Sequence, residues 1–470
     1  MTSIFPALLA AGLAIAGCES KPTSTPTTTP TSADATPPKP APDTACRDWS
    51  TLDRASLPAL PKAKHTALLE QVWTKVLERH YDPTLGCLDW PAIRETYGAR
   101  VAAAKTDDEA YTAISDMLRE LKQSHLGLVP PGGEASDAPA AERPVGNGRV
   151  PIEVTMLGDE LVVAKAKWYG KKAPIPAGAT LVSIDEHVIA ALVAKANERS
   201  KERVVERDFQ LVRFAQAILS CGAGDSHELV WQAPGKTKTT KKKIACHVPE
   251  RRTATFGNLR DVPVEVESKL LEGTKVGYVR FNIWLMDLSP EIERAVGDLR
   301  TKGMESLVID LRGNPGGVGA MVVPIGRLLL DRDADLGVMK MRGAEQRFAI
   351  KRGTDPFTGP VVILVDAGTA STSEIFAQAL KDLGRAKIIG TSESQGAALP
   401  SVIEKLDGGA MLQYVVGDYT SPAGIAVEGK GVVPDVRVTV TREDLMNGRD
   451  PVLLAAIAAL SAPASKGDSK

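Results

Sequence analysis

The sequence carries almost no net charge and few aromatic side chains. Its 470 residues include 57 lysines and arginines against 58 aspartates and glutamates, and aromatic residues make up 4% of the chain. Without a basic field there is no electrostatic basis for binding nucleic acid, and we expect no such partner. The basic run at residues 236–243 is expected to be a solvated hairpin tip.

Metal-ligand spacing is also missing. The five cysteines form no CxxC pair, so Cys221, His227, Cys246 and His247 lack the usual spacing of zinc ligands. We therefore expect no metal site and no cofactor.

Long apolar runs are missing as well. The apolar stretch at residues 7–17 is shorter than the about 20 residues of a membrane-spanning helix, and it is typical of an export signal. It ends in Ile-Ala-Gly before Cys18, which resembles the lipobox of bacterial lipoproteins. The resemblance implies a signal peptide at 1–17, a lipidated Cys18 and a membrane anchor. Because Glu19 replaces the aspartate linked to inner-membrane retention, we expect an extracytoplasmic protein on the outer membrane, at its periplasmic face or the cell surface.

No lysine or arginine precedes the apolar stretch, so the true start can differ from Met1. After Cys18, residues 20–45 are rich in Pro, Thr, Ser and Ala, with almost no large apolar side chains. Such a segment cannot bury a core. We therefore interpret residues 18–60 as a lipidated cysteine followed by a tether.

Besides Cys18, the chain has Cys46, Cys87, Cys221 and Cys246. An even number of cysteines in an exported chain favours disulfides. Four cysteines allow three pairings. Sequence proximity favours Cys46–Cys87 and Cys221–Cys246.

The remaining chain is long enough for two or three domains of about 100–200 residues each. Apolar residues at three- and four-residue spacing predict helices between residues 65 and 121. The predicted domains are a helical domain at 61–130, an insert domain at 149–250, a core at 255–445, and a C-terminal helix and tail at 446–470.

The core alternates strands with helices, which predicts an α/β layered domain. Strands are expected at 276–281, 306–311, 361–366 and 387–390, and helices at 289–302, 318–329 and 373–383.

Two core segments, LVIDLRGNPGG at 307–317 and VVILVDAGTASTSEIF at 361–376, each run from an apolar strand into a tight turn. The amides of Gly316 and Gly317 are suited to bind an anion, and Ser371 lies where a helix begins. A nucleophile beside an oxyanion hole is what acyl transfer to a serine requires. The segments therefore predict a serine hydrolase, although the stretch before Glu374 also has the composition of a plain helix cap.

In this order, the two segments resemble the DLRxNxGG and SASASE motifs of the tail-specific, or C-terminal processing, serine proteases and their tricorn-like relatives. The resemblance spans roughly residues 65–440 and is strongest over 276–435. It implies Ser371 as the nucleophile and Gly317, beside Gly316, with the amide of Thr372 as the oxyanion hole. It also implies a crotonase- or ClpP-like superhelix of strands and helices for the core.

The general base separates the branches of this family. The processing proteases use a lysine 25 residues after the nucleophile, but that position is Gly396 here. Lys381 and Lys387 lie nearby and are interpreted as surface cations. A Ser–Lys dyad is therefore disfavoured.

The tricorn-like branch uses a Ser-His pair and a distant glutamate instead, and this chain has Ser124-His125 and, before a GVxPD-type turn, Glu428. By that resemblance, His125 is the base for Ser371, Ser124 hydrogen-bonds its imidazole, and Glu428 orients Ser124. Asp310, Arg312 and Asn314 are expected to hold the glycine turn.

The fragment at 178–188 resembles the GDxIxxIDG segment of PDZ modules, but Glu186-His187 replaces the glycine turn. The helical stretch that follows, about 190–219, is longer than a minimal PDZ domain needs. The insert is thus either PDZ-like or specific to the family.

We interpret the chain as a lipid-anchored serine endopeptidase that cleaves unfolded or C-terminally exposed polypeptides through an acyl-enzyme on Ser371. Two alternatives stay open: a ligand- or peptide-binding module without activity on the same scaffold, and an esterase for small acyl groups. The oligomeric state is not predicted.

Overall fold

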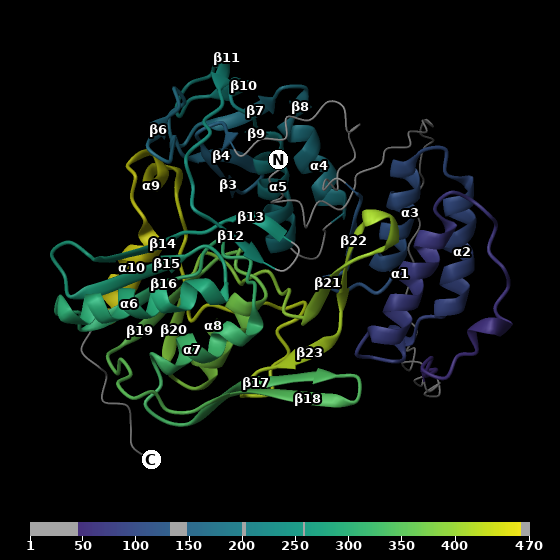
Figure 1. Cartoon of the computed structure of the whole chain (residues 1–470). Coiled ribbons are helices and arrows are strands. Elements are labelled where there is room, and N and C mark those ends of the chain that lie inside the picture. Colours follow the sequence, from purple (N-terminus) through teal and green to yellow (C-terminus); the bar gives the residue numbers. More distant parts are fainter. Residues whose placement is uncertain (1–45, 132–147, 200–203, 257–258, 462–470) are drawn as a thin grey trace, which may run out of the picture.

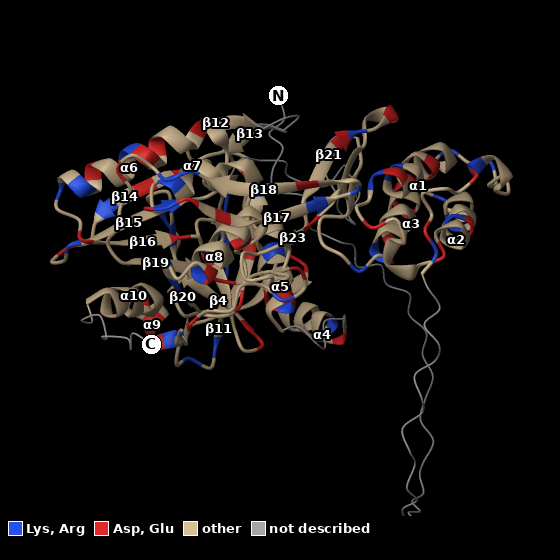
Figure 2. Ribbon diagram, turned by 90° about the horizontal axis from the view of Figure 1, so that it is seen from below, with Lys and Arg blue, Asp and Glu red and all other residues tan. Residues whose placement is uncertain are grey.

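The computed structural model describes residues 46–131, 148–199, 204–256 and 259–461. The predicted signal peptide, Cys18 and most of the tether lie outside these residues. Figure 1 shows three parts: a helical bundle to one side, a layered core, and a smaller sheet with two helices above the core. Basic and acidic residues are interspersed along the ribbon, as the balanced charge suggests (Figure 2).

The bundle lies within the predicted range 61–130. Its helices are α1 (Thr66–Arg79), α2 (Trp90–Ala103) and α3 (Asp107–Arg119). Asp89 accepts a hydrogen bond from the amide of Ala92 and caps α2, and Thr106 caps α3 in the same way. None of the helices in the described part of the chain is long and apolar enough to cross a membrane.

The insert is built on one sheet, in the order β11-β10-β7-β4-β3, with two helices. The predicted single helical stretch at 190–219 is divided into α4 and α5. The predicted hairpin carries the basic run, but most of that run lies in the exposed edge strand β11 and not at the tip. Lysines on an edge strand discourage pairing with other chains. The bounds are β3 (Glu153–Leu157), β4 (Glu160–Lys165), β7 (Thr180–Ile184), α4 (Ile189–Arg199), α5 (Val204–Ile218), β10 (Ser226–Gln232) and β11 (Thr239–Ala245).

Short strands complete the insert and its junction with the core. They are β2 (Gly148–Arg149), β5 (Lys167–Trp168), β6 (Lys171–Lys172), β8 (His187–Val188), β9 (Ser220–Cys221), β12 (Thr253–Phe256) and β13 (Leu259–Pro263).

The core confirms the predicted α/β architecture. Its six-stranded sheet has the order β14-β15-β16-β19-β20-β24, in which β14 is antiparallel to β15 and the other neighbours are parallel. The strands are β14 (Val266–Leu270), β15 (Val276–Phe281), β16 (Ser306–Asp310), β19 (Val361–Val365), β20 (Ala386–Gly390) and β24 (Val436–Arg437). The helices are α6 (Ser289–Thr301), α7 (Val322–Arg327), α8 (Thr372–Asp382), α9 (Arg442–Met446) and α10 (Pro451–Ser461).

Both faces of this sheet are covered, which is why its strands read as continuous apolar runs. Leu307 and Ile309 point to the core shared with α6, α7 and α8. Val308, between them, packs with Val452 and Ala456 of α10 on the opposite face. Figure 2 shows the sheet between these two layers.

Two hairpins extend the core. Strands β17 (Ala334–Met341) and β18 (Ala344–Ile350) form the first, and β17 also pairs with β23 (Gly417–Thr420). Strands β21 (Ser401–Lys405) and β22 (Met411–Val415) form the second hairpin.

The β21–β22 hairpin joins the core to the helical bundle. Strand β1 (Gly127–Val129), which follows the bundle, pairs with β22. Leu412 and Tyr414 are buried among the apolar residues of the bundle. The chain segment before β1, which contains His125, is thereby fixed at the junction of the two parts.

Candidate active site

Ser371 occupies the turn between β19 and α8. Its backbone lies at φ 56° and ψ −121°, a conformation that residues other than glycine rarely adopt. Its amide donates to the carbonyl of Ala397 and to Oε2 of Glu374, each at 2.9 Å. Such backbone strain costs about 1–3 kcal/mol and persists where the surroundings enforce it.

The glycine turn packs directly against Ser371. A Cβ atom on Gly316 would lie 2.6 Å from Cβ of Ser371, and one on Gly317 would lie 2.2 Å from the carbonyl oxygen of Trp284. Both glycines also have positive φ angles, of 93° and 143°. Glycine is therefore required at both positions for the two turns to meet.

The structure distinguishes the three expected oxyanion donors. The amide of Gly316 donates to Oδ1 of Asn314 at 3.0 Å. The amides of Gly317 and Thr372 donate to no group among the described residues, and Oγ1 of Thr372 donates to the carbonyl of Gly317 at 3.0 Å. Two unpaired amides therefore remain beside Ser371, those of Gly317 and Thr372.

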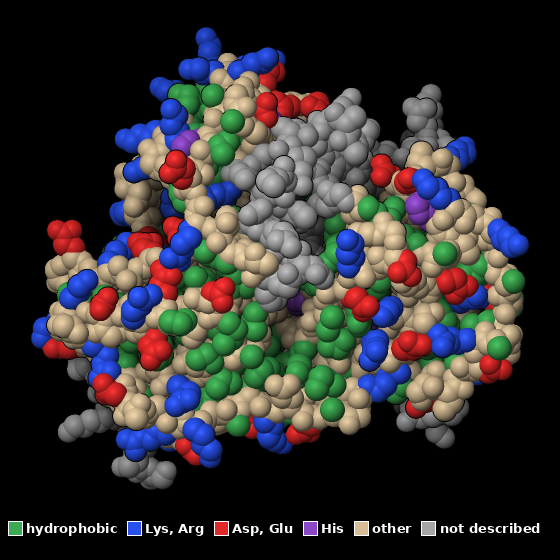
Figure 3. Space-filling model, viewed as in Figure 1, with side chains coloured by type: hydrophobic (Ala, Val, Ile, Leu, Met, Phe, Trp, Pro, Cys, Tyr) green, Lys and Arg blue, Asp and Glu red, His purple; other side chains and the backbone are tan. Residues whose placement is uncertain are grey.

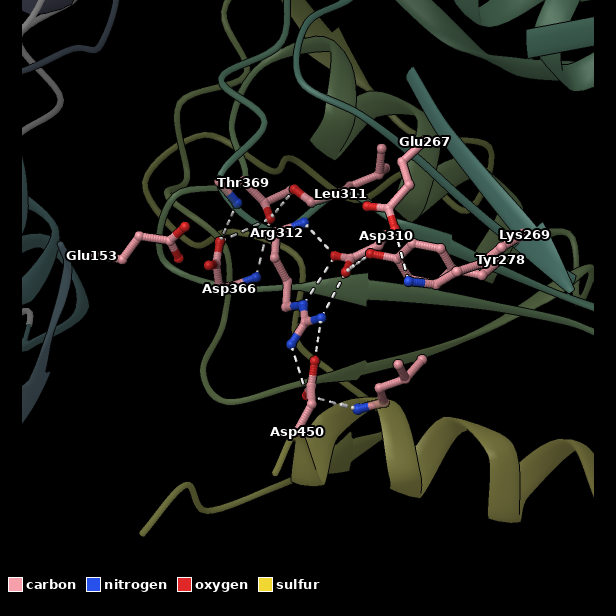
Figure 4. A network of polar contacts seen from close by, with 12 residues as sticks. Glu153, Glu267, Lys269, Tyr278, Asp310, Leu311, Arg312, Asp366, Thr369 and Asp450 are labelled. Carbon is pink, nitrogen blue, oxygen red and sulfur yellow. Dashed lines mark hydrogen bonds and ion pairs between the residues drawn. The ribbon is translucent and has the colours of Figure 1, made fainter. Parts of the chain in front are cut away.

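A polar network around Arg312 lies where strand β16 leads into the glycine turn (Figure 4). The Arg312 guanidinium donates to both Asp310, at 2.9 and 2.6 Å, and Asp450, at 3.0 and 2.8 Å. Although burial opposes it, the hydrogen bonds and charge of Arg312 hold the pKa of Asp310 below its ordinary value. Asp366 accepts from the amide of Gly313 at 2.8 Å. These contacts fit the expected turn-holding role of Asp310 and Arg312.

Ser124, His125 and Glu428 come together although they are far apart in the sequence. Oγ of Ser124 lies 2.7 Å from Nδ1 of His125 and 2.9 Å from Oε2 of Glu428, and the Ser124 amide donates to Oε1 of Glu428 at 2.8 Å. Because the Ser124 hydroxyl gives its one proton to the carboxylate, it accepts from Nδ1–H of His125. The Nε2 atom is then the unprotonated nitrogen, as a general base requires.

His125 also has a left-handed backbone, with φ 57°. Desolvation lowers the pKa of its imidazole to about 4, so the ring is neutral at pH 7. Among the described residues no hydrogen bond joins His125 to Ser371. Hydrogen bonds between catalytic groups are often long in free enzymes and tighten when substrate binds.

Sequence reasoning did not identify Glu374 as a site residue. Its side chain is fully buried, and its two carboxylate oxygens accept four hydrogen bonds, from Ser371, Ser394, Gly396 and Ala397. Burial raises its pKa to about 7, against these hydrogen bonds. The sequence feature that could have pointed to Glu374 is its spacing from Ser371, which is typical of a capping box.

Of the two lysines near Ser371 in sequence, one makes contacts elsewhere and the other is exposed. Lys381 donates to the carbonyl of Val433 at 2.6 Å and pairs with Asp435 at 2.9 Å. Lys387 is exposed on β20. The amide of Gly396, at the position of the family's lysine, donates to Glu374.

Two disulfides are present, Cys46–Cys87 and Cys221–Cys246. This is the pairing that sequence proximity favours. His227 lies within 4.8 Å of both sulfurs of the second pair, but sulfurs joined to each other are not thiolate ligands.

Known proteins resemble this chain in sequence and in fold. Residues 275–438 match the profile of peptidase family S41, and residues 61–119 match that of the tricorn protease C1 domain. The carboxyl-terminal-processing protease of Picosynechococcus sp. is 28% identical over 369 residues, which cover 78% of this chain and 82% of that protein.

Solved structures share the fold. The photosystem II D1 C-terminal processing protease matches with a TM-score of 0.51 at 24% identity and covers 83% of this chain and 99% of its own. Mature CPAF, solved in complex with lactacystin, matches with a TM-score of 0.58 at 12% identity and covers 84% and 97%. The profile matches and this relative agree: residues 275–438 form a peptidase family S41 domain, and the chain is a serine-type peptidase.

Proposed function

We propose that this protein is an extracytoplasmic serine endopeptidase that cleaves unfolded or C-terminally exposed polypeptides through an acyl-enzyme on Ser371. The observation that carries the proposal is the unpaired amides of Gly317 and Thr372 beside a strained Ser371. The hydrogen-bonded series Glu428–Ser124–His125 supplies a base of the correct tautomer.

In the first step, Oγ of Ser371 attacks the scissile carbonyl carbon and its proton passes to Nε2 of His125. The carbonyl oxygen takes up the negative charge and accepts hydrogen bonds from the amides of Gly317 and Thr372. The carbon–nitrogen bond then breaks, and His125 returns the proton to the leaving amine. Water, activated by the same imidazole, hydrolyses the ester and frees Ser371.

Ser124 and Glu428 have supporting roles in this proposal. The Ser124 hydroxyl holds Nδ1–H of His125, and Glu428 fixes that hydroxyl and the Ser124 amide at once. The carboxylate stabilises the imidazolium that forms during proton transfer without itself taking the proton.

An unfolded polypeptide is the substrate class that the surface favours. Hydrophobic side chains gather over the region of α7, α8 and β23 on the face shown in Figure 3. Val318, directly after Gly317, is among the partly buried apolar residues of the core. Two relatives are named C-terminal processing proteases, which supports action near exposed carboxyl ends. A PDZ-like role for the insert remains part of the proposal.

The location is proposed from the sequence and the disulfides together. Disulfides persist in oxidising compartments, which favours an exported protein. We propose that Cys18 carries a lipid anchor on the outer membrane and that the residues after it form the tether. A Cys18→Ala protein should lose its association with membranes; quantitative membrane fractionation of this variant would contradict the anchor.

The activity is tested by incubating the mature protein with native lysozyme and with reduced, carboxymethylated lysozyme, followed by mass spectrometry of the products. We expect cleavage of the unfolded form only, and none by Ser371→Ala. Equal cleavage by Ser371→Ala would overturn the proposed nucleophile.

A further inference from the structure

Glu374 is a fully buried carboxylate that accepts four hydrogen bonds beside Ser371, and the proposed mechanism does not use it. Its Oε2 accepts from the amides of Ser371 and Ala397, each at 2.9 Å. Its Oε1 accepts from the hydroxyl of Ser394 at 2.5 Å and the amide of Gly396 at 2.6 Å. One buried side chain thus holds the nucleophile's backbone and the segment 394–397.

The residue that follows this segment, Ala398, reaches Glu428. The amide of Ala398 donates to Oε2 of Glu428 at 2.9 Å, directly after the two amides that donate to Glu374. The amide of Gly429 returns a hydrogen bond to the carbonyl of Gly396 at 2.8 Å. Three consecutive amides are therefore shared between the two carboxylates.

Ser394 adds a further link. Its hydroxyl donates to Glu374 and accepts from the amide of Val432 at 2.6 Å. The amide of Gln395 donates to the carbonyl of Thr369, at the start of the serine turn, at 2.9 Å. The segment 394–398 is thus bonded to the turn that carries Ser371 and to the turn that carries Glu428.

We propose that Glu374 is a positioning residue of the reaction: through segment 394–398 it aligns Ser371 with Glu428 and, by way of Ser124, with His125. The inference rests on the proposed function. It also assigns a role to Gly396, which stands where the processing proteases carry their catalytic lysine. The backbone amide of Gly396 binds the carboxylate that holds the nucleophile.

The test compares Glu374→Gln with a matched control, Glu393→Gln. The glutamine keeps length and volume but turns one acceptor into a donor that faces amide protons. Glu393 directly precedes Ser394 in the sequence, and its carboxylate contacts Arg437 at 2.7 Å.

Two rates are measured for each variant: labelling by a fluorophosphonate, in which Oγ of Ser371 bonds to phosphorus and fluoride leaves, and hydrolysis of carboxymethylated lysozyme. For Glu374→Gln we expect losses of about 10- to 100-fold in labelling rate and kcat with little change in KM. Glu393→Gln should stay within about twofold of the parent. A wild-type labelling rate for Glu374→Gln, or a loss confined to KM, would overturn the inference.

The link to Glu428 is tested by the double variant Glu374→Gln/Glu428→Gln. If the two carboxylates act through one shared segment, the double variant loses less than the product of the single losses. A loss equal to that product contradicts the link. If Glu374→Gln does not fold, Ser394→Ala decides, since it removes only one hydroxyl; we expect a loss of several-fold, and an unchanged rate contradicts the inference.

Failure of this inference differs from failure of the proposed function. If Ser371→Ala cannot be labelled while Glu374→Gln is labelled at the full rate, only the role of Glu374 is wrong. If Ser371→Ala is still labelled, the proposed nucleophile is wrong.

Discussion

At the scale of single residues, the account depends on two side chains with left-handed backbones, Ser371 and His125. Neither conformation is locally favourable, so each is held by contacts from other segments. Ser371 is held by Glu374 and Ala397, and His125 by its neighbour Ser124 and by strand β1 that follows. Contacts from these other segments thus hold both residues in their backbone conformations.

The supporting residues should matter less than the two that transfer the proton. We expect Ser124→Ala and Glu428→Gln each to lower turnover of an unfolded substrate by about 10- to 100-fold, because the base is still present but less well oriented. Lys381→Ala, whose ammonium contacts Val433 and Asp435, should be close to neutral and serves as the control. Loss of turnover in Lys381→Ala would indicate a lysine base.

The pH profile follows from the base. His125 must be neutral to accept the proton, so activity falls as pH drops through its pKa, which burial lowers from an ordinary 6.5 to about 4. Burial also raises the pKa of Glu428, which must stay ionised to hold Ser124. Because His125 as a residue is only half-buried, we expect an acid limb between about 4 and 6.5 and a plateau above it.

Initial rates across pH, for the parent and for Glu374→Gln, check this expectation. Burial raises the pKa of Glu374 to about 7, and its titration is absent from the variant, so a limb retained there belongs to His125 or Glu428. A profile that rises only above about pH 8 would instead indicate a lysine.

At the scale of elements, the strand–turn–helix units around Gly317 and Ser371 could be predicted because their signals are local: apolar strands, turn residues and helix caps. The role of Glu374 could not, since its partners Gly396 and Ala397 belong to a separate segment with no recognisable pattern. The β17–β18 hairpin was not predicted either. The β21–β22 hairpin packs into a domain more than 250 residues earlier in the chain, and alternating apolar residues do not reveal which core they join.

This hairpin yields a prediction. Leu412 is fully buried where the hairpin enters the helical bundle, and it pairs with Leu128 of β1, close to His125. Leu412→Ala should lower the free energy of unfolding by about 2–5 kcal/mol. It should also reduce activity at temperatures where the protein is still folded, because β1 no longer fixes the segment that carries His125.

Leu229→Ala is the matched control, since Leu229 is equally buried but lies in the insert. Denaturant titration should show similar destabilisation, while turnover of the control falls far less. Equal loss of turnover in both variants would mean that stability alone explains the effect.

At the scale of the whole molecule, the candidate site is assembled from four segments of the chain: the end of the bundle, the glycine turn, the serine turn and the loop with Glu428. A domain layout could be predicted from composition and periodicity, but the way the parts meet depends on packing between distant segments. The disulfides lie outside these contacts and stabilise the bundle and the insert separately.

Thiol titration of the denatured, unreduced mature protein should find Cys46, Cys87, Cys221 and Cys246 all oxidised. The bridges close loops with sequence separations of 41 and 25 residues, so each is expected to stabilise the fold by about 3–4 kcal/mol through loop-closure entropy. Reduction should therefore lower the thermal midpoint. Four free thiols, or an unchanged midpoint after reduction, would contradict this expectation.

The most direct test of the central claim is the site and rate of labelling by a fluorophosphonate, mapped by mass spectrometry. The account predicts one modified residue, Ser371, no label in Ser371→Ala, and a rate several orders of magnitude lower in His125→Ala, with the double variant little worse than either single one. A label on another serine, or an unchanged rate in a folded His125→Ala protein, would contradict it.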